Sequence, residues 1–292
     1  MNERLLDIIT CPNCEDSQRL DIADDHLSCS ACGSKYKMIQ GKPVLCPIPS
    51  EQVSDNPPKS TGTGSFWRKQ NWEFAERFSR DISGEQVMLE VGTGSGYYKP
   101  LFPGSYIGTD LRLTNSVDFA CNLAEQQAIR PSSLDMVLLS NLLEHVFEFE
   151  TLLRNVVIGL KPNGLLLIMV PWGGLHYVPR DFFRYTQWAL AAMAGKFGLE
   201  LVSLEGVYQP FTVVYNAIAN LEKSIPRGGG IRNSLARVIA RFTRRIIVAK
   251  ALAYLIRDPR PMGVVDDLNM NPEHKREVSQ FPLGYHAAYR KL

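Results

Sequence analysis

Apolar runs alternate with amphipathic segments from Ser65 onward, and this alternation predicts the fold. Five apolar runs rich in valine, isoleucine and leucine are typical of strands buried on both faces of a parallel sheet, and two later segments predict further strands. Together they cover residues 86–92, 105–111, 117–122, 134–141, 164–172, 200–208 and 281–292. Helical patterns cover residues 65–80, 142–164 and 186–198, the second ending at Pro162 and Gly164 and the third at Gly198. Short strands alternating with helices predict an α/β sheet.

Two segments depart from this alternation. About six residues separate Asp110 from Val117, which is too few for a crossover helix, so we expect a short loop there. Residues 209–277 exceed what the sheet requires, and we interpret them as an insertion.

Composition and charge narrow the class of protein. A chain of 292 residues is long enough for one full hydrophobic core and a small extra module. Its net charge of +2 is too small to indicate nucleic-acid or membrane binding by the whole chain. The sequence shows no apolar run of signal-peptide length at its beginning and no transmembrane segment. We therefore expect a cytoplasmic protein, in a compartment that keeps thiols reduced.

Four of the six cysteines form two pairs near the beginning of the chain, Cys11-Pro-Asn-Cys14 and Cys29-Ser-Ala-Cys32. Each pair is able to turn two thiolates toward one ion, and two such pairs complete the closed tetrahedral shell of a structural zinc site. Four unrelated buried thiols or a redox pair are the alternatives. The pattern predicts a zinc ribbon over residues 1–48, because so small a module needs a metal for stability. Residues 49–64 have linker composition.

The residues around these cysteines resemble a known family. Leu5-Leu-Asp-Ile-Ile-Thr-Cys-Pro and Tyr36-Lys-Met-Ile-Gln-Gly-Lys-Pro-Val-Leu45 are similar to the zinc-ribbon proteins that activate tRNA and release-factor methyltransferases. The resemblance covers residues 5–47 and implies that the ribbon assists a methyltransferase fused in cis. Some ribosomal-RNA methyltransferases begin with a similar ribbon, so this module does not select a substrate.

A glycine-rich loop follows the first strand of the predicted sheet, in Glu90-Val-Gly92-Thr-Gly94-Ser-Gly96. Glycines permit a sharp turn and a close approach of a ligand to the backbone. We expect a helix to begin after the loop and to offer its free N–H groups to the ligand. The dinucleotide fingerprint requires a third glycine at Tyr97, which disfavours NAD. A glycine loop without a ligand is the remaining alternative.

Three later features of the sequence make the pattern that begins with the glycine loop more specific for one family. Asp110 ends the second strand, Asn122-Leu123 ends the third, and Ser140-Asn141-Leu-Leu-Glu-His145 follows the fourth. This ordered set resembles the class I S-adenosylmethionine-dependent methyltransferases, especially the branch with quinone-biosynthesis and other small-molecule enzymes, over about residues 86–208. The resemblance implies a Rossmann-like sheet, mostly parallel with its last strand antiparallel, over residues 65–292.

The resemblance also implies roles for single residues. The three glycines would surround the methionine part of the cofactor, with Glu90 beneath them, and Asp110 would bind the ribose. Asn122 stands where the family has an aspartate that contacts the adenine amino group, and its amide oxygen is still able to accept that hydrogen bond. The predicted cofactor residues are Glu90, Gly92, Gly94, Gly96, Asp110, Asn122, Leu123 and Asn141.

Methyl transfer depends mainly on orientation of the acceptor, and a hydroxyl acceptor also needs a base. His145, His176, Asp181 and Arg184 follow strands at the edge of the sheet where ligands bind, and we name them as catalytic candidates. The alternatives are that His145 only covers the cofactor and that Asp181 and Arg184 form an ion pair that holds a loop closed. The sequence after the fourth strand lacks the Asn/Asp-Pro-Pro-Tyr motif typical of amino-nitrogen methylation of bases.

The insertion carries a basic amphipathic segment, residues 231–257. It has apolar residues on one helical face and arginines on another, and no acid between Arg227 and Arg257. Such a helix lies on an anionic membrane surface or contacts RNA, or it packs on the domain with solvated arginines. The first interpretation favours a small-molecule, lipid-linked or glycan-type acceptor, and peripheral membrane association. An RNA methyltransferase and a non-catalytic scaffold protein are the alternatives.

Overall fold

The computed structural model describes most of the chain, apart from its first residues, the linker and parts of the insertion. The described residues are 4–14, 19–23, 25–48, 53, 66–80, 82–104, 106–173, 180–208, 218, 222, 225–226, 230–257, 264–266 and 282–292.

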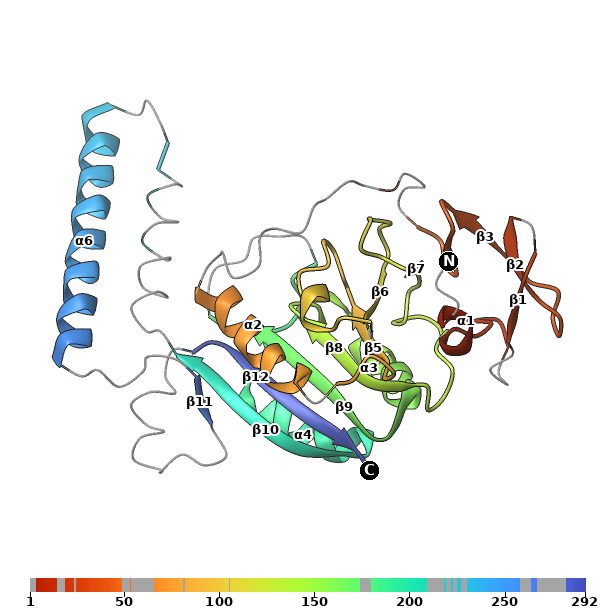
Figure 1. The fold of residues 1–292 in the computed structure, drawn as a ribbon. Helices are drawn as coiled ribbons and strands as arrows, with labels where there is room; N and C mark the ends of the chain where they lie inside the picture. Colours follow the sequence, from red (N-terminus) through yellow and green to blue (C-terminus); the bar gives the residue numbers. More distant parts are fainter. Residues whose placement is uncertain are drawn as a thin grey trace.

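A small antiparallel sheet occupies the N-terminal part of the chain (Figure 1). It follows the short helix α1 (Leu5–Ile8) and has the strand order β1 (Leu20–Ile22), β2 (His26–Cys29), β3 (Lys35–Ile39), β4 (Lys42–Pro43). The turn between β2 and β3 contains Gly33, whose φ of 72° requires a residue without Cβ strain. This unit carries the two cysteine pairs.

A second sheet of eight strands forms the body of the molecule, in the order β11-β10-β12-β9-β8-β5-β6-β7 (Figure 1). Its members are β5 (Met88–Val91), β6 (Tyr106–Asp110), β7 (Phe119–Ala120), β8 (Leu134–Ser140), β9 (Leu160–Pro171), β10 (Leu199–Tyr208), β11 (Val264–Asp266) and β12 (Pro282–Lys291). Strands β7, β6, β5, β8 and β9 are parallel neighbours. Strand β12 pairs antiparallel with β9 and β10. The mostly parallel sheet with an antiparallel last strand is therefore confirmed.

Helices cover both faces of this sheet. On one face, Phe74 and Ala75 of α2 (Phe66–Ser79) belong to one apolar cluster with Met136 and Leu138 of β8. On the other face, α3 (Phe149–Gly159) packs against β9, α4 (Gln187–Phe197) packs against β10, and both helices share an apolar cluster with the alternate residues of β8. Strands buried on both faces explain the continuous apolar runs of the sequence.

The sequence predicted the end of one helix correctly and the end of another wrongly. Helix α4 begins after Thr186, whose hydroxyl accepts from Ala189 N at 3.2 Å, and ends at Gly198 in the left-handed conformation, as predicted. Helix α3, however, ends at Gly159 rather than at Pro162 and Gly164, so that prediction was wrong. Strand β9 already begins at Leu160, which pairs with Leu134 of β8.

The N-terminal unit packs directly on the edge of the large sheet. Val44 forms a parallel bridge with Ala120 of β7, and Leu45 N donates to Ala120 O at 2.8 Å. At a second contact, Ile9 pairs with Ile129. The apolar side chains of both parts form one continuous core cluster. The N-terminal unit and the large sheet therefore share one hydrophobic core.

Candidate functional site

The loop after β5 has the backbone that its glycines predict. Gly92, Gly94 and Gly96 have φ angles of 76°, 53° and 71°. A Cβ on Gly92 would lie 2.9 Å from Leu142, and one on Gly96 would lie 2.5 Å from Ser116, whereas a Cβ on Gly94 would meet no atom within 4 Å. Packing therefore excludes a side chain at Gly96, a side chain at Gly92 would displace the flexible end of Leu142, and Gly94 faces open space.

The helix expected after this loop is not formed. Turns follow Gly96, and then the three-residue 3₁₀ helix η1 (Lys99–Leu101). The chain instead anchors the loop to the next strand, since Gly94 N donates to Asp110 Oδ2 at 2.9 Å and Thr114 donates to Gly94 O at 2.7 Å. The backbone amide that was expected to face a ligand at this point is thus already occupied by Asp110.

The predicted cofactor residues separate into two cavities that meet at Gly92. The smaller cavity, of about 200 Å³, lies beyond the carboxyl ends of β6 and β7. Asp110 and Asn122 supply its polar groups, and its apolar walls include Leu123, Leu142 and Val146. Such a cavity fits a ligand that has a planar base, which would lie between the apolar walls, and a hydroxylated sugar, which would lie beside the carboxylate.

The larger cavity, of about 390 Å³, lies at the ends of β5 and β8. Of the predicted residues it contains Glu90, Gly92, Gly94, Asn141, His145 and Asp181. Helix α2 closes its other side with Trp67, whose indole Nε1 donates to Asn141 Oδ1 at 2.7 Å. The sequence predicted α2 as a helix but gave no role to its aromatic residues. Gly96 is not among the lining residues of either cavity.

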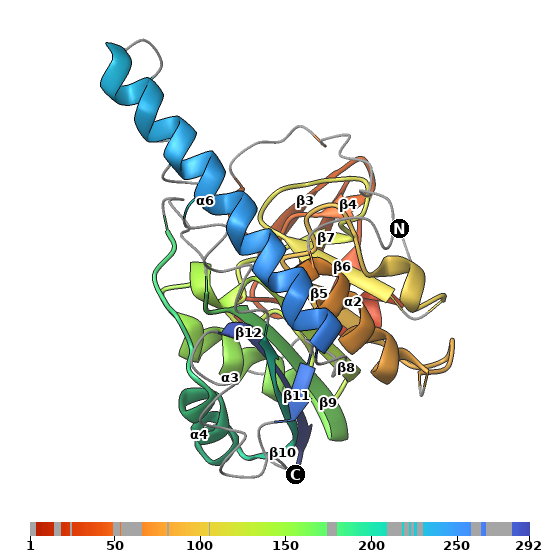
Figure 2. The ribbon, with the colours of Figure 1, turned by 90° about the vertical axis from the view of Figure 1, so that its left-hand side faces the viewer.

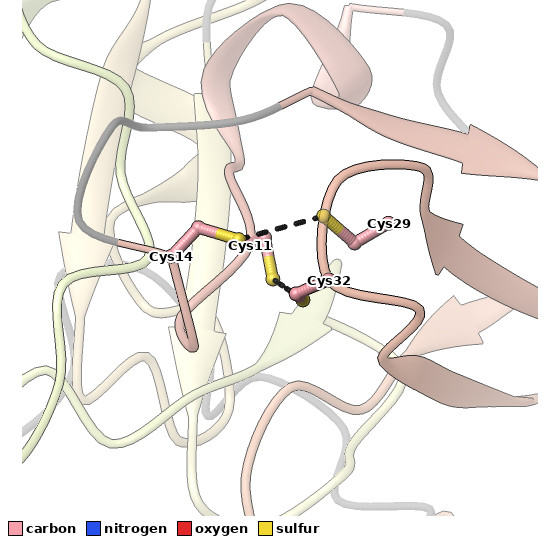
Figure 3. Close-up of side chains that lie close together, drawn as sticks. All are labelled: Cys11, Cys14, Cys29 and Cys32. Atoms are coloured by element: carbon pink, nitrogen blue, oxygen red, sulfur yellow. Dashed lines mark hydrogen bonds between the residues drawn. The ribbon is translucent and has the colours of Figure 1, made fainter.

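The two cysteine pairs lie together in the N-terminal unit (Figure 3). Their four sulfur atoms lie within 4.8 Å of one another, with Cys11 Sγ 3.7 Å from Cys32 Sγ and Cys14 Sγ 3.6 Å from Cys29 Sγ. Four thiolates that hold one ion in a tetrahedron at about 2.3 Å have sulfurs about 3.8 Å apart. The cysteines are not joined by disulfides, and their arrangement fits a tetrahedral metal site.

The family comparison agrees with the sheet and the glycine loop. Residues 89–168 match the sequence profile of the family described as a methyltransferase domain, a segment that runs from β5 into β9. This segment is therefore similar to a methyltransferase domain. The fold is the Rossmann-like class I sheet that the sequence predicted.

Solved structures similar to the methyltransferase domain have low overall similarity. Phosphoethanolamine N-methyltransferase 2 of Haemonchus contortus, in complex with S-adenosyl-L-methionine, is 18% identical over 76% of this chain, with a TM-score of 0.44. This chain covers 52% of that protein. An S-adenosylmethionine-dependent methyltransferase from Archaeoglobus fulgidus is 15% identical, covering 75% of this chain and 94% of its own, with a TM-score of 0.43.

A complex of the Haloferax volcanii Trm112 methyltransferase activator with a putative methyltransferase is 15% identical, with 46% of this chain and 70% of that one covered and a TM-score of 0.39. At such scores these likenesses add nothing to the fold assignment, which depends on the strand order and the family match. No curated protein matches the chain in sequence.

Glu90 of the methyltransferase domain is a buried carboxyl group, with 3% of its surface exposed. Burial raises its pKa to about 8; the hydrogen bond from Tyr106 Oη lowers the pKa, and the charge of Asp110 raises it. The protonated form is therefore favoured at neutral pH as long as no cation lies nearby.

Glu144 also lines the larger cavity, and the sequence analysis gave it no role. It belongs to the 3₁₀ helix η2 (Leu143–His145), and burial raises its pKa to about 7. Among the described residues, its Oε2 atom has no hydrogen-bond partner. The only signal in the sequence was an acid directly before the candidate His145 at the end of a strand.

The four catalytic candidates are placed differently. His145 lines the larger cavity, with Nδ1 3.1 Å from Arg180 O and Nε2 3.8 Å from Glu144 Oε1. Asp181 lines the same cavity and forms a bidentate ion pair with Arg184, which explains why the pKa of Arg184 is raised. Arg184 is not among the lining residues of either cavity. His176 lies outside the described residues.

Proposed function

We propose that this protein transfers the methyl group of S-adenosylmethionine to a small-molecule, lipid-linked or glycan-type acceptor. The observation that carries the proposal is the pair of cavities that meet at Gly92. The smaller cavity would hold the adenosine part, with Asp110 at the ribose and Asn122 at the base. The larger cavity would hold the methionine part and the reactive end of the acceptor.

Three residues have distinct roles in this proposal. His145 and Asp181 line the larger cavity and would contact the acceptor, whereas Arg184 acts through its ion pair with Asp181. Neutral imidazole with Nδ1–H donating to Arg180 O leaves Nε2 as the basic nitrogen. A hydroxyl acceptor would lose its proton to this nitrogen as the methyl group arrives.

Exposed aromatic rings favour an acceptor with an apolar part. Phe147 is 65% exposed and lies two positions after His145 in the chain. Phe182 is 46% exposed and follows Asp181 directly. Their ring centroids are 5.4 Å apart. An acyl, prenyl or similar apolar group of the acceptor, extending out of the larger cavity, would cover these rings and remove their surface from water.

We also propose that the four cysteines hold a structural zinc ion. Closed tetrahedral thiolate shells select zinc among the common divalent ions, and a reducing compartment keeps the thiols available. The cysteine arrangement supports the interpretation of residues 1–48 as a zinc ribbon. We also propose that the protein works in the cytoplasm, where such thiols stay reduced. Within the described parts of the chain, no helix has the length and apolarity needed to span a membrane.

The test is calorimetric titration of zinc-analysed protein with S-adenosylmethionine, compared with a Gly94→Arg variant. A side chain at Gly94 enters the larger cavity without meeting the core, so the variant is expected to fold and to lose binding. Gly198→Arg is the matched control, because Gly198 also has a positive φ, 66°, and open space around it, but lies at the end of α4. Absence of binding to the folded wild-type protein would refute the proposal.

A further inference from the structure

Helix α6 (Gly230–Arg257) presents its apolar face outward. It stands apart from the large sheet in Figure 1 and crosses the front of the molecule in Figure 2. Six of its apolar side chains are between 43% and 88% exposed: Ile231, Leu235, Val238, Ile239, Phe242 and Ile246. At 100° per residue these positions fall within one stripe about 100° wide along the helix. We call these six residues the outer stripe.

The opposite face of α6 is small and polar. Ala240 is 6% exposed, and Arg244 is half-buried, with its guanidinium 3.1 Å from Glu222 Oε2. Arg241 Nε also donates to Glu222 Oε1, at 2.7 Å. A helix that packs on its own domain has the reverse arrangement, with apolar residues inside and charges outside. The alternative that α6 packs on the domain through its apolar face is therefore wrong for the described residues.

Basic residues lie on both sides of the outer stripe. By the same helical geometry, Arg232 flanks it on one side and Arg245 on the other, and both are exposed. The sequence contains no acid between Lys223 and Arg257. An apolar stripe with arginines at its borders matches a bilayer, where the apolar side chains enter the acyl region and the arginines meet anionic headgroups.

We infer that α6 docks the protein on an anionic lipid bilayer, lying in the plane of the surface with the outer stripe inserted. RNA is disfavoured, because a polyanion in water gives no reason for six exposed apolar side chains, and two of the nearby arginines are paired with Glu222. The inference rests on the proposed function in one respect: a lipid-linked acceptor would be held at that surface.

The experiment is co-flotation of the full-length, zinc-containing protein with vesicles. Binding is expected to equal parts of phosphatidylglycerol and phosphatidylcholine, and to be much weaker with phosphatidylcholine alone. Replacing Leu235 and Phe242 together by serine removes two side chains that are 57% and 64% exposed, so the fold is expected to remain. Their loss is expected to weaken vesicle binding by at least about a hundredfold.

Two further variants separate the apolar and the electrostatic parts. Replacing Ile158 and Trp188 by serine removes two exposed apolar side chains of α3 and α4, and this matched control is expected to bind vesicles as the wild type does. Replacing Arg232 and Arg245 by glutamine is expected to weaken binding to anionic vesicles about fivefold for each arginine. The same loss of binding in the matched control would overturn the inference.

Other occupants of the stripe give different results. A dimer that the Leu235 and Phe242 variant dissociates, without vesicle binding, would show that a second copy covers the stripe and would overturn the inference. RNA binding that this variant retains, without vesicle binding, would also overturn it. Vesicle binding by a protein that fails to bind S-adenosylmethionine would support docking while refuting the proposed function, so the two failures are distinguishable.

Discussion

Binding of S-adenosylmethionine is expected to release a proton from Glu90. Without a ligand, burial keeps the pKa of this carboxyl near 8, so it is mostly protonated at neutral pH. The methionine part of the cofactor carries an ammonium and a sulfonium group, and a cation close to a carboxyl group favours its ionised form. If the larger cavity holds this part of the cofactor, binding and deprotonation of Glu90 are coupled.

The coupling sets the size and direction of the effect. Below the pKa of the free protein, affinity is expected to rise about tenfold for each pH unit, which corresponds to about 1.4 kcal/mol. The rise ends near pH 8, where Glu90 is already ionised before the cofactor binds. Glu90→Gln has no proton to release, so its affinity is expected to be lower near pH 8 and nearly independent of pH.

Stability is expected to respond in the opposite sense. The folded-state pKa of Glu90 lies above the ordinary value of 4.5, so the folded protein retains a proton that the unfolded chain loses. Stability therefore falls as pH rises from about 4.5 to about 8, by on the order of 4 kcal/mol from this group alone. Glu90→Gln is expected to melt at a higher temperature than the wild type at pH 8.

Calorimetry in phosphate and in Tris buffer measures the released proton, because the two buffers take up protons with different heats. The wild type is expected to show a buffer-dependent heat at pH 7 that the Gln variant lacks. In Tyr106→Phe, loss of the hydroxyl that bonds to Glu90 is expected to move the break in affinity to higher pH. Equal heats in both buffers for the wild type would refute the coupling.

Two other predictions concern the metal site and the second buried carboxyl. Cys14→Ser is expected to lose bound zinc, to melt at a lower temperature and to bind S-adenosylmethionine several-fold more weakly. Cys46 lies outside the cluster, so Cys46→Ser is the control and is expected to retain zinc by metal analysis. A zinc-free Cys14→Ser variant with an unchanged melting temperature would contradict this prediction. Burial raises the pKa of Glu144 to about 7, so ionisation of this carboxyl group lowers the stability of the protein as pH rises from about 4.5 to 7. In urea titrations, Glu144→Gln is expected to remove about 2–3 kcal/mol of that decline. The exposed Glu148→Gln is the control, and equal pH slopes in both variants would show that Glu144 ionises freely.

The sequence predicted the parts of the fold that local patterns determine. Apolar runs buried on both faces gave the strands, and the short segment after Asp110 gave a loop, which the structure confirms between β6 and β7. The end of α3 was missed because pairing of Leu160 with Leu134 depends on a strand distant in sequence. The prediction of a helix after Gly96 was wrong, because Asp110 and Thr114, from another segment, stabilise turns there.

The candidate site was predictable where a residue type is tied to a strand end. Asp110 and Asn122 line one cavity and Glu90 lines the other, as strand ends on one edge of a sheet require. The contributions of Trp67 and Glu144 were not predictable. Helix α2 reaches the cavity only through packing, and the pKa of Glu144 depends on burial that no local pattern reveals.

The contact between Val44, Leu45 and the two-residue strand β7 also bears on aggregation. An open edge of a sheet offers unpaired N–H and C=O groups to any other chain, and proteins usually protect such edges. Here the protecting segment belongs to the unit that holds the four cysteines, so the edge is covered only while that unit is folded. If the four cysteines hold zinc as proposed, chelation of the ion would therefore leave the β7 edge open to pairing with another chain.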